Sequence, residues 1–378
     1  MNIVFVSNFL NHHQIPLCDA LKARSDSFWF IATENGGRQG FQLSQDRDYV
    51  IDYNLEKSRV DSLLLSADVV IFGGCPNGMI EMRMAENKLS FLFSERFFKK
   101  GVWRRFIPKT AKTVRERVAA YAGKNLYVLC ASAFLPYDLS FFHFPADKCI
   151  RWGYFPEVKH YENLQSLIDS KKTASLLWVG RFLDWKHPEA AVLVAKRLKA
   201  EGLDFELNII GNGEKEEALR KGIEKYGLKD CVHMLGSMKP DDVRSHMERS
   251  EVFLFTSDRR EGWGAVLNEA MNSGCAVVAS NAIGSAPYLV EDGQNGLIYK
   301  SGDLGDLYAK AKWLLTHPSE RKNMAQNAYQ TMVNEWNAEN AATRLAALAK
   351  DILGGKEHPA TSGSGVCSVA DMLRDDWR

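Results

Sequence analysis

The chain has 378 residues, of which 46% are hydrophobic and 11% aromatic, and its formal net charge is +1 at pH 7. This length and composition suffice for two packed domains, and the near-neutral charge argues against a globally basic nucleic-acid-binding protein. The seven cysteines are scattered and include no C-x-x-C pair, as is typical of buried thiols in a reducing compartment. The sequence has neither a leader pattern nor an apolar run of about eighteen residues, so we expect a cytoplasmic protein.

The first part of the chain alternates short apolar runs with amphipathic stretches. Strands are predicted near 2–7, 27–33, 68–72, 89–94 and 125–130, and helices near 57–65, 79–87, 110–122 and 131–140. This alternation is typical of a parallel sheet with helices on both faces. We therefore predict an N-terminal Rossmann-like domain over residues 1–160.

A polar segment over residues 151–172 precedes a second series of strands and helices. Its strands are predicted at 176–179, 205–210, 232–234, 252–255 and 276–279. The series predicts a second Rossmann-like domain over 170–335, followed by a helix over 336–353 and a mobile tail over 354–378 that is rich in Ser, Gly and charge. The fold class is α/β, and a ligand is expected in a cleft between the two domains, at the carboxyl ends of the strands.

The segment 261–269 links a predicted strand to a predicted helix and contains two carboxylates. Gly262 and Gly264 permit close approach of the backbone to a ligand, and first-turn amides favour an anion such as a diphosphate. Eight residues of helix rise about 12 Å, so Glu261 and Glu269 are placed to accept hydroxyl hydrogen bonds at opposite ends of an elongated ligand. A nucleotide sugar has this layout. Ordinary solvated charges are the alternative interpretation.

Two cations lie five residues apart in the loop after the strand 176–179. Arg181 and Lys186 can converge there on one dianion, the first as a planar fork and the second as a point charge. Solvated loop charges are again the alternative. Gly211 ends another predicted strand in a G-x-G pattern that suits backbone contact with a ligand, although this pattern alone is weak.

In combination with the turn at 281–287, the segment 261–269 resembles the E-x7-E element of the retaining glycosyltransferases of family four, which have the GT-B fold. This resemblance implies that the first domain, 1–160, is on the acceptor side and that the helix over 336–353 crosses back to it. The segment 180–186 resembles the G-R-x-x-x-x-K element of the same family. The resemblance implies that Arg181 and Lys186 bind the donor diphosphate and stabilise the leaving group, while Glu261 holds the sugar and Glu269 the ribose. Further donor contacts are implied at Gly262, Trp263, Gly264, Gly211 and Leu235, the last in the turn that packs against the nucleotide base.

The resemblance implies a retaining hexosyltransferase that moves a sugar from a nucleotide diphosphate sugar to an acceptor hydroxyl, in surface polysaccharide or glycolipid synthesis. A sugar-nucleotide epimerase of the same fold and a non-catalytic nucleotide-sugar-binding protein are the alternatives. No metal cofactor is expected, because Arg181 and Lys186 can neutralise the diphosphate. The D-x-D spacing of Asp46 and Asp48 lies in a hydrophilic stretch rather than at the end of an apolar strand.

On the acceptor side, His12 and His13 stand at the start of the first predicted helix, where the helix dipole favours the neutral imidazole. Helix capping and packing are the alternative roles. Many members of the family have a Gly-Gly pair in this loop and a His after the fourth strand. This chain has neither at those positions, and Glu95, which follows the fourth strand, is the substitute candidate.

The segment 95–117 is the most cationic part of the chain. Its nine basic residues face two acidic ones and are Arg96, Lys99, Lys100, Arg104, Arg105, Lys109, Lys112, Arg115 and Arg117. Trp103 and Phe106 lie between them, and this mixture suits the surface of an anionic bilayer. We therefore predict peripheral contact with the cytosolic face of a membrane and a saccharide or lipid-linked saccharide as acceptor, with no nucleic-acid partner. Packing of the aromatic residues into the first domain is the alternative.

Overall fold

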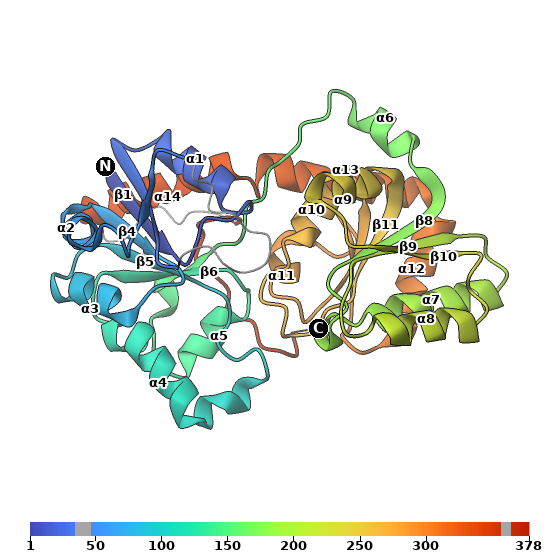
Figure 1. Ribbon diagram of the computed structural model, residues 1–378, viewed down its shortest axis with the longest axis horizontal. Helices are drawn as coiled ribbons and strands as arrows, with labels where there is room; N and C mark the ends of the chain where they lie inside the picture. The colour runs from blue at the N-terminus through green and yellow to red at the C-terminus, as the bar shows by residue number, and fades with distance from the viewer. Residues whose placement is uncertain (35–46, 357–363, 378) are drawn as a thin grey trace. The chain divides into compact units, whose positions relative to one another are not determined.

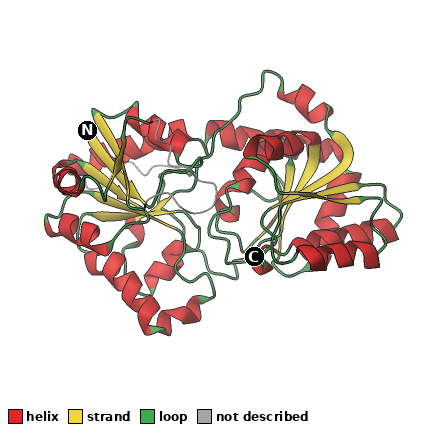
Figure 2. Ribbon diagram, viewed as in Figure 1, coloured by secondary structure: helices red, strands yellow, loops and turns green. Residues whose placement is uncertain are grey.

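The computed structural model describes residues 1–34, 47–356 and 364–377. It consists of two compact units, one formed by Met1–Glu157 with Trp336–Arg374 and the other by Val158–Glu335 with Asp375–Arg378. In each unit a sheet lies between layers of helices (Figure 2), which confirms the predicted α/β class. Among the described helices, none combines the length and the apolar character that a membrane span requires.

The described residues of the first unit form a seven-stranded parallel sheet in the order β3-β2-β1-β4-β5-β6-β7 (Figure 1). The strands are β1 Asn2–Ser7, β2 Ser27–Ala32, β3 Val50–Asp52, β4 Val69–Phe72, β5 Ser90–Ser94, β6 Leu126–Cys130 and β7 Cys149–Arg151. All four residues of β4 are buried, as expected of an apolar strand with helices on both faces. The three-residue strands β3 and β7 were not predicted, because so short a run carries no readable periodicity.

The helices of this unit cover both faces of the sheet and include the last long helix of the chain. They are α1 Ile15–Lys22, α2 Lys57–Ser66, α3 Asn77–Ala85, η1 Val102–Phe106, α4 Pro108–Arg117, η2 Ala119–Tyr121, α5 Leu135–Ser140, η3 Ala146–Lys148 and α14 Ala338–Leu353. Helix α14 packs against α1 (Figure 1). At this contact Nε of Arg24 donates a hydrogen bond of 2.8 Å to the hydroxyl of Thr343.

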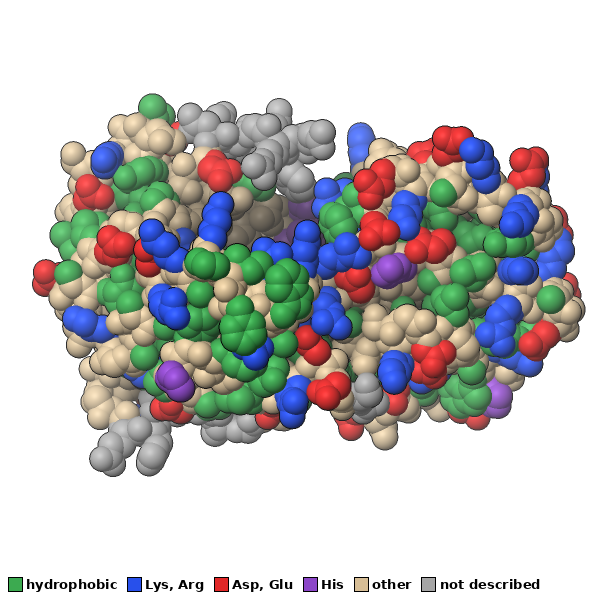
Figure 3. Space-filling model, turned by 90° about the horizontal axis from the view of Figure 1, so that it is seen from below, with side chains coloured by type: hydrophobic (Ala, Val, Ile, Leu, Met, Phe, Trp, Pro, Cys, Tyr) green, Lys and Arg blue, Asp and Glu red, His purple; other side chains and the backbone are tan. Residues whose placement is uncertain are grey.

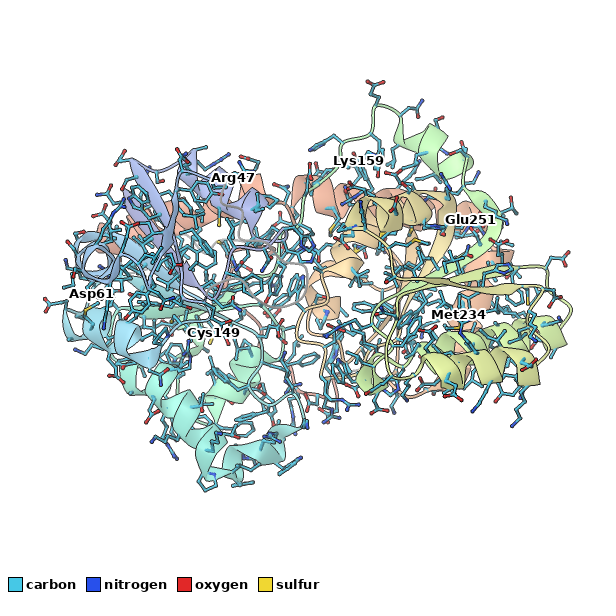
Figure 4. The ribbon with its side chains drawn as sticks, in the orientation of Figure 1. Arg47, Asp61, Cys149, Lys159, Met234 and Glu251 are labelled. Carbon is cyan, nitrogen blue, oxygen red and sulfur yellow. The ribbon has the colours of Figure 1, made fainter. Side chains whose placement is uncertain are left out.

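The described part of the C-terminal tail is packed against β7, where the sequence predicted a mobile tail. Val366 and Cys367 are buried, and the amide of Cys367 donates to the carbonyl of Arg151 at 2.9 Å. The amide of Ala370 donates to the carbonyl of Cys149, which Figure 4 labels on β7, at 2.8 Å. An edge strand leaves backbone groups unpaired, and this short apolar segment satisfies them. The sequence did not predict this packed segment, because the tail as a whole is rich in Ser, Gly and charged residues.

In the second unit, the described residues form a six-stranded parallel sheet in the order β10-β9-β8-β11-β12-β13. The strands are β8 Lys172–Val179, β9 Glu206–Ile210, β10 Val232–Gly236, β11 Ser250–Phe255, β12 Ala276–Ser280 and β13 Leu297–Tyr299. The helices are α6 Leu164–Asp169, η4 Asp184–Lys186, α7 Pro188–Ala200, α8 Glu216–Lys225, α9 Pro240–Arg249, α10 Val266–Asn272, α11 Ala286–Leu289, α12 Leu304–Thr316 and α13 Pro318–Asn334.

The core of the second unit places the loops that follow its strands. Trp178 of β8 and Leu254 of β11 are buried in one apolar cluster with residues of α7, α8 and α12. Because all strands of the sheet run in the same direction, the loops after β8, β9 and β11 leave the core at one edge. Every donor-side residue predicted above lies in these loops, in α10 or at the end of β10.

Candidate active site

The loops after β8 and β9 are joined through backbone contacts at two glycines. The amide of Phe182 donates to the carbonyl of Asn212 at 2.7 Å. Gly211 has φ = 142°, and a Cβ at this position would lie 1.9 Å from the carbonyl oxygen of Gly180. Gly213 has φ = 147°, and a Cβ there would lie 2.9 Å from the backbone nitrogen and oxygen of Phe182. A side chain at either glycine would separate the loops. Packing between the loops therefore requires glycine at both positions, whether or not a ligand binds there.

The predicted base-binding turn lies beside this junction. Leu235 is half-buried near the end of the edge strand β10, one residue after Met234 (Figure 4). The pairing register with β9 shifts between Met234 and Gly236, and the carbonyl of Gly236 accepts a hydrogen bond of 2.8 Å from the amide of Gly211. The structure therefore brings the predicted positions Leu235 and Gly211 together.

Lys186 and Glu261, both predicted catalytic residues, form an ion pair. The hydroxyl of Ser257 donates to Oε2 of Glu261, the same oxygen that Lys186 contacts, at 3.0 Å. The side chains of Lys186 and Glu261 are 13% and 15% exposed, so the pair is largely shielded from water. Arg181, by contrast, is exposed, and no carboxylate among the described residues pairs with it. One predicted cation is thus held by a carboxylate and the other is open to a ligand.

A set of hydrogen bonds ties the segment that carries Lys186 to the end of β11. The hydroxyl of Thr256 donates to the carbonyl of Lys186 at 2.6 Å and accepts from Nε1 of Trp178 at 2.8 Å. His187 has φ = 49°, and its ring nitrogens lie 3.4 Å from Asp258 and 3.1 Å from Glu189. These two carboxylates raise the pKa of His187 to about 9, which adds a positive charge next to Lys186 at neutral pH.

The segment after Glu261 differs from the prediction in two respects. Helix α10 begins at Val266, has seven residues and does not include Glu261, so the two glutamates do not lie on one helix. The side chain of Trp263 is buried, and its indole nitrogen donates to Oδ1 of Asn268 at 2.9 Å. The side chain of Trp263 therefore belongs to the core. Only backbone atoms of this residue could make the predicted contact with the donor.

Gly262, Gly264 and Glu269 complete the predicted donor-side set. Gly262 is buried, whereas Gly264 has φ = 82° and approaches the ring of Phe255 so closely that a Cβ would lie 2.3 Å from it. Glu269 lies in α10. Burial raises the pKa of its carboxyl to about 6, and the Arg244 guanidinium acts in the opposite direction.

Glu95 lines a cavity of about 540 Å³ in the first unit. Its carboxylate pairs with Lys99 and accepts a hydrogen bond from the hydroxyl of Tyr154. Gly73 and Gly74, which follow β4, also line the cavity, and a Cβ at Gly73 would lie 3.1 Å from the hydroxyl oxygen of Ser7 at the end of β1. Sequence reasoning missed Tyr154 and this glycine pair. The signal for the glycines was a Gly-Gly directly after a buried strand.

His12 and His13 lie in the loop between β1 and α1, and their ring centroids are 3.7 Å apart. The pKa of both imidazoles is lowered, as predicted, but the cause is burial rather than the helix dipole. For His13 the pKa is about 3, with a further contribution from the neighbouring ring. Of the D-x-D pair, Asp46 lies outside the described residues, and Asp48 forms an exposed ion pair with Lys22 at 2.5 Å.

Comparison with known proteins relates the second unit to a family. Residues 162–331 match the family model described as glycosyl transferases group 1. This region, which is less than half of the 378 residues, is similar to that family. The amylovoran biosynthesis glycosyltransferase AmsK of Erwinia amylovora is 30% identical over 44% of this chain and 41% of its own length. The alpha-D-kanosaminyltransferase of Streptomyces kanamyceticus is 29% identical over 47% of this chain and 45% of its own length. The chain thus spans less than half the length of these two group 1 relatives.

The fold extends beyond the matched region. The structure of Anabaena Alr3699/HepE in complex with UDP is similar to 94% of this chain and to 100% of its own chain, with a TM-score of 0.72 and 16% identity. At this identity the likeness establishes the fold alone. Both units of the chain therefore have the α/β architecture of GT-B structures, as predicted.

Proposed function

We propose that this chain is a retaining glycosyltransferase that moves a sugar from a nucleotide diphosphate sugar to an acceptor hydroxyl. The observation that carries the proposal is the pairing of Lys186 with Glu261 at the strand-end loops of the second unit, with the exposed cation Arg181 in the same segment after β8 as Lys186. UDP is the proposed nucleotide, since the structurally similar HepE was crystallised with UDP. The name of AmsK supports a place in polysaccharide biosynthesis.

The proposed mechanism assigns one role to each charged residue. Arg181 and Lys186 bind the diphosphate and stabilise the negative charge that develops on it as the bond to the sugar breaks. Glu261 accepts hydrogen bonds from the sugar, and Glu269 accepts them from the ribose. When the diphosphate enters, the Lys186 ammonium contacts the phosphate oxygens while it keeps Glu261 in place. With two protein cations at the leaving group, the transfer proceeds without a metal ion.

The decisive experiment is the release of UDP from UDP-sugars in the presence and absence of glycan acceptors, with and without EDTA. Acceptor-dependent release of UDP that persists in EDTA is the expected result. Release of UDP with an altered free sugar and no acceptor would identify an epimerase instead. Binding without any release would identify a nucleotide-sugar-binding protein. Activity that EDTA abolishes and Mg²⁺ or Mn²⁺ restores would contradict the metal-independent mechanism.

We further propose that the first unit contacts an anionic membrane surface on the cytosolic side through Trp103 and Phe106, whose side chains are exposed. Trp103 is 57% and Phe106 73% exposed, and both belong to the short helix η1. Lys109 and Lys112 follow on the exposed side of α4. Figure 3 shows hydrophobic and basic side chains next to one another on the face of the first unit that carries this helix.

Only part of the cationic segment is available for such contact. Arg96 is buried in a pair with Asp138 at 2.8 Å, and Arg117 donates to the backbone carbonyl of Cys75 at 2.9 Å. The remaining exposed cations can each contribute up to about 1 kcal/mol near an anionic surface. Together with the two exposed aromatic side chains they support reversible, peripheral binding.

A further inference from the structure

The cavity in the first unit carries positive charge that the described carboxylates do not neutralise. Two of its cations are paired, since Arg96 contacts Asp138 and Lys99 contacts Glu95. Three further lining cations, Lys100, Arg104 and Arg117, have no carboxylate partner among the described residues. A concave surface with one sign of charge concentrates ligands of the opposite sign.

A buried anchor fixes the loop that carries Lys100. The Asp138 carboxylate is completely shielded from solvent and accepts hydrogen bonds from Arg96 and, at 2.9 Å, from the amide of Phe98. The side chain of Phe98 is itself buried in the core of the unit. The loop then turns at Gly101, which has φ = 109°, and enters η1. The basic side chains after this anchor therefore extend from a backbone that is held in place. Less conformational entropy of the loop is then lost when these side chains bind a ligand.

Further lining residues of the cavity come from the end of α4 and from the loop after β4. Arg117, at the end of α4, donates to the carbonyls of Gly73 at 3.1 Å and Cys75 at 2.9 Å. Its guanidinium is thereby held beside Gly73, which lines the cavity together with Gly74. Tyr154 and Glu95 also line the cavity.

We propose that this cavity binds the phosphate group of a phosphorylated acceptor. Three unneutralised cations exceed what one carboxylate requires and match the two or more negative charges of a phosphate monoester or a diphosphate. The phosphate comes either from a soluble sugar phosphate or from a lipid diphosphate that carries the saccharide. This inference rests on the proposed function, because an acceptor site implies a transferase. It adds the chemical class of the acceptor.

The test uses the whole 378-residue chain saturated with UDP, so that the proposed donor cations are occupied. Glucose 1-phosphate, glucuronate and methyl glucoside are titrated calorimetrically into the parent, the Lys100→Ser/Arg104→Ser variant and the Lys109→Ser/Lys112→Ser variant. The Lys109→Ser/Lys112→Ser variant is the control. It loses the same net charge as the Lys100→Ser/Arg104→Ser variant, but from exposed positions that do not line the cavity. We expect glucose 1-phosphate to bind the parent and the control alike, and the cavity variant at least tenfold more weakly. UDP affinity should be equal in all three proteins.

Three results would overturn the assignment. They are the failure of the parent to bind either glucose 1-phosphate or the lipid diphosphate described below, equal binding by all three proteins, and glucuronate binding as tight as that of glucose 1-phosphate. Failure of the parent to bind UDP would instead count against the proposed function, so the two failures are distinguishable.

A second arm separates the two sources of phosphate. Sedimentation with neutral phosphatidylcholine vesicles that contain farnesyl diphosphate measures binding to a lipid diphosphate without a general anionic surface. Binding to these vesicles that requires Lys100 and Arg104 assigns the cavity to a lipid-linked acceptor. Binding of glucose 1-phosphate without binding to the vesicles assigns it to a soluble sugar phosphate.

Discussion

The Lys186 ammonium donates a hydrogen bond to the Glu261 carboxylate, although the two residues lie 75 positions apart in the sequence. Lys186 follows β8 and Glu261 follows β11, and these strands are neighbours in the sheet. Each charge keeps the other in position, so the pair is organised before a ligand arrives. Substitutions at these two residues can therefore test the contribution to donor affinity and the contribution to turnover one at a time.

Lys186→Ala should weaken UDP binding by roughly ten- to a hundredfold, because loss of a charged hydrogen bond costs about 1.5–3 kcal/mol. Glu261→Gln keeps an oxygen that can accept the hydrogen bond of Lys186, so it should change UDP affinity much less than Lys186→Ala does, and it should lower turnover, since its proposed contact is with the transferring sugar. Calorimetry with UDP and steady-state kinetics measure the two effects. Lys229→Ala, which breaks an exposed ion pair with Glu224, is the control and should alter neither quantity. Unchanged UDP affinity in Lys186→Ala would refute its donor role.

Donor affinity should depend on pH through Glu269. Its pKa is raised to about 6, and the ionised carboxylate is the form that accepts hydrogen bonds from both ribose hydroxyls. Affinity for UDP should therefore fall as the pH is lowered through about 6 and be constant above it. In Glu269→Gln this step should disappear. Titration of UDP itself is common to both proteins and cancels in the difference between their profiles. Parallel profiles would exclude Glu269 from the ribose site.

Gly211→Ala should destabilise the second unit. The Cβ would lie 1.9 Å from the Gly180 carbonyl oxygen, so the two loops would have to separate. Backbone strain and overpacking together cost on the order of 2–6 kcal/mol. Gly202→Ala is the matched control, since Gly202 also has a positive φ, 74°, but no atom lies within 4 Å of a Cβ there. Urea unfolding should show a markedly lower midpoint for Gly211→Ala than for the control. Equal midpoints would contradict the packing described here.

Removal of the exposed aromatic side chains should abolish membrane contact. Trp103→Ser/Phe106→Ser should sediment less with anionic vesicles than the parent, and added salt should reduce parent binding because the cations contribute. Leu55→Ser is the control, since Leu55 is 81% exposed in the same unit but outside the cationic segment. If the parent fails to bind at low salt, or the aromatic variant binds as well as the parent, membrane contact through η1 is excluded.

The sequence by itself determined the α/β class, the resemblance of the second unit to a family and the strand-end position of the proposed donor residues. These properties are local. Apolar runs with polar loops reveal parallel strands, and the spacing of Arg181, Lys186, Glu261 and Glu269 within two short segments is visible without any fold. Strands of three residues and the packed segment near Cys367 were not visible, because pairing with distant strands, and not local pattern, stabilises them.

Only the tertiary structure decided what each candidate side chain contacts. It placed Trp263 in the core, since the indole finds its partner in Asn268, and it paired Lys186 with Glu261 while Arg181 stayed open. It also divided one cationic stretch into a buried anchor at Arg96, a cavity wall at Lys100 and an exposed surface at Lys109. Net charge along a sequence cannot make this division, because burial and the partner of each charge depend on residues that are remote in the chain.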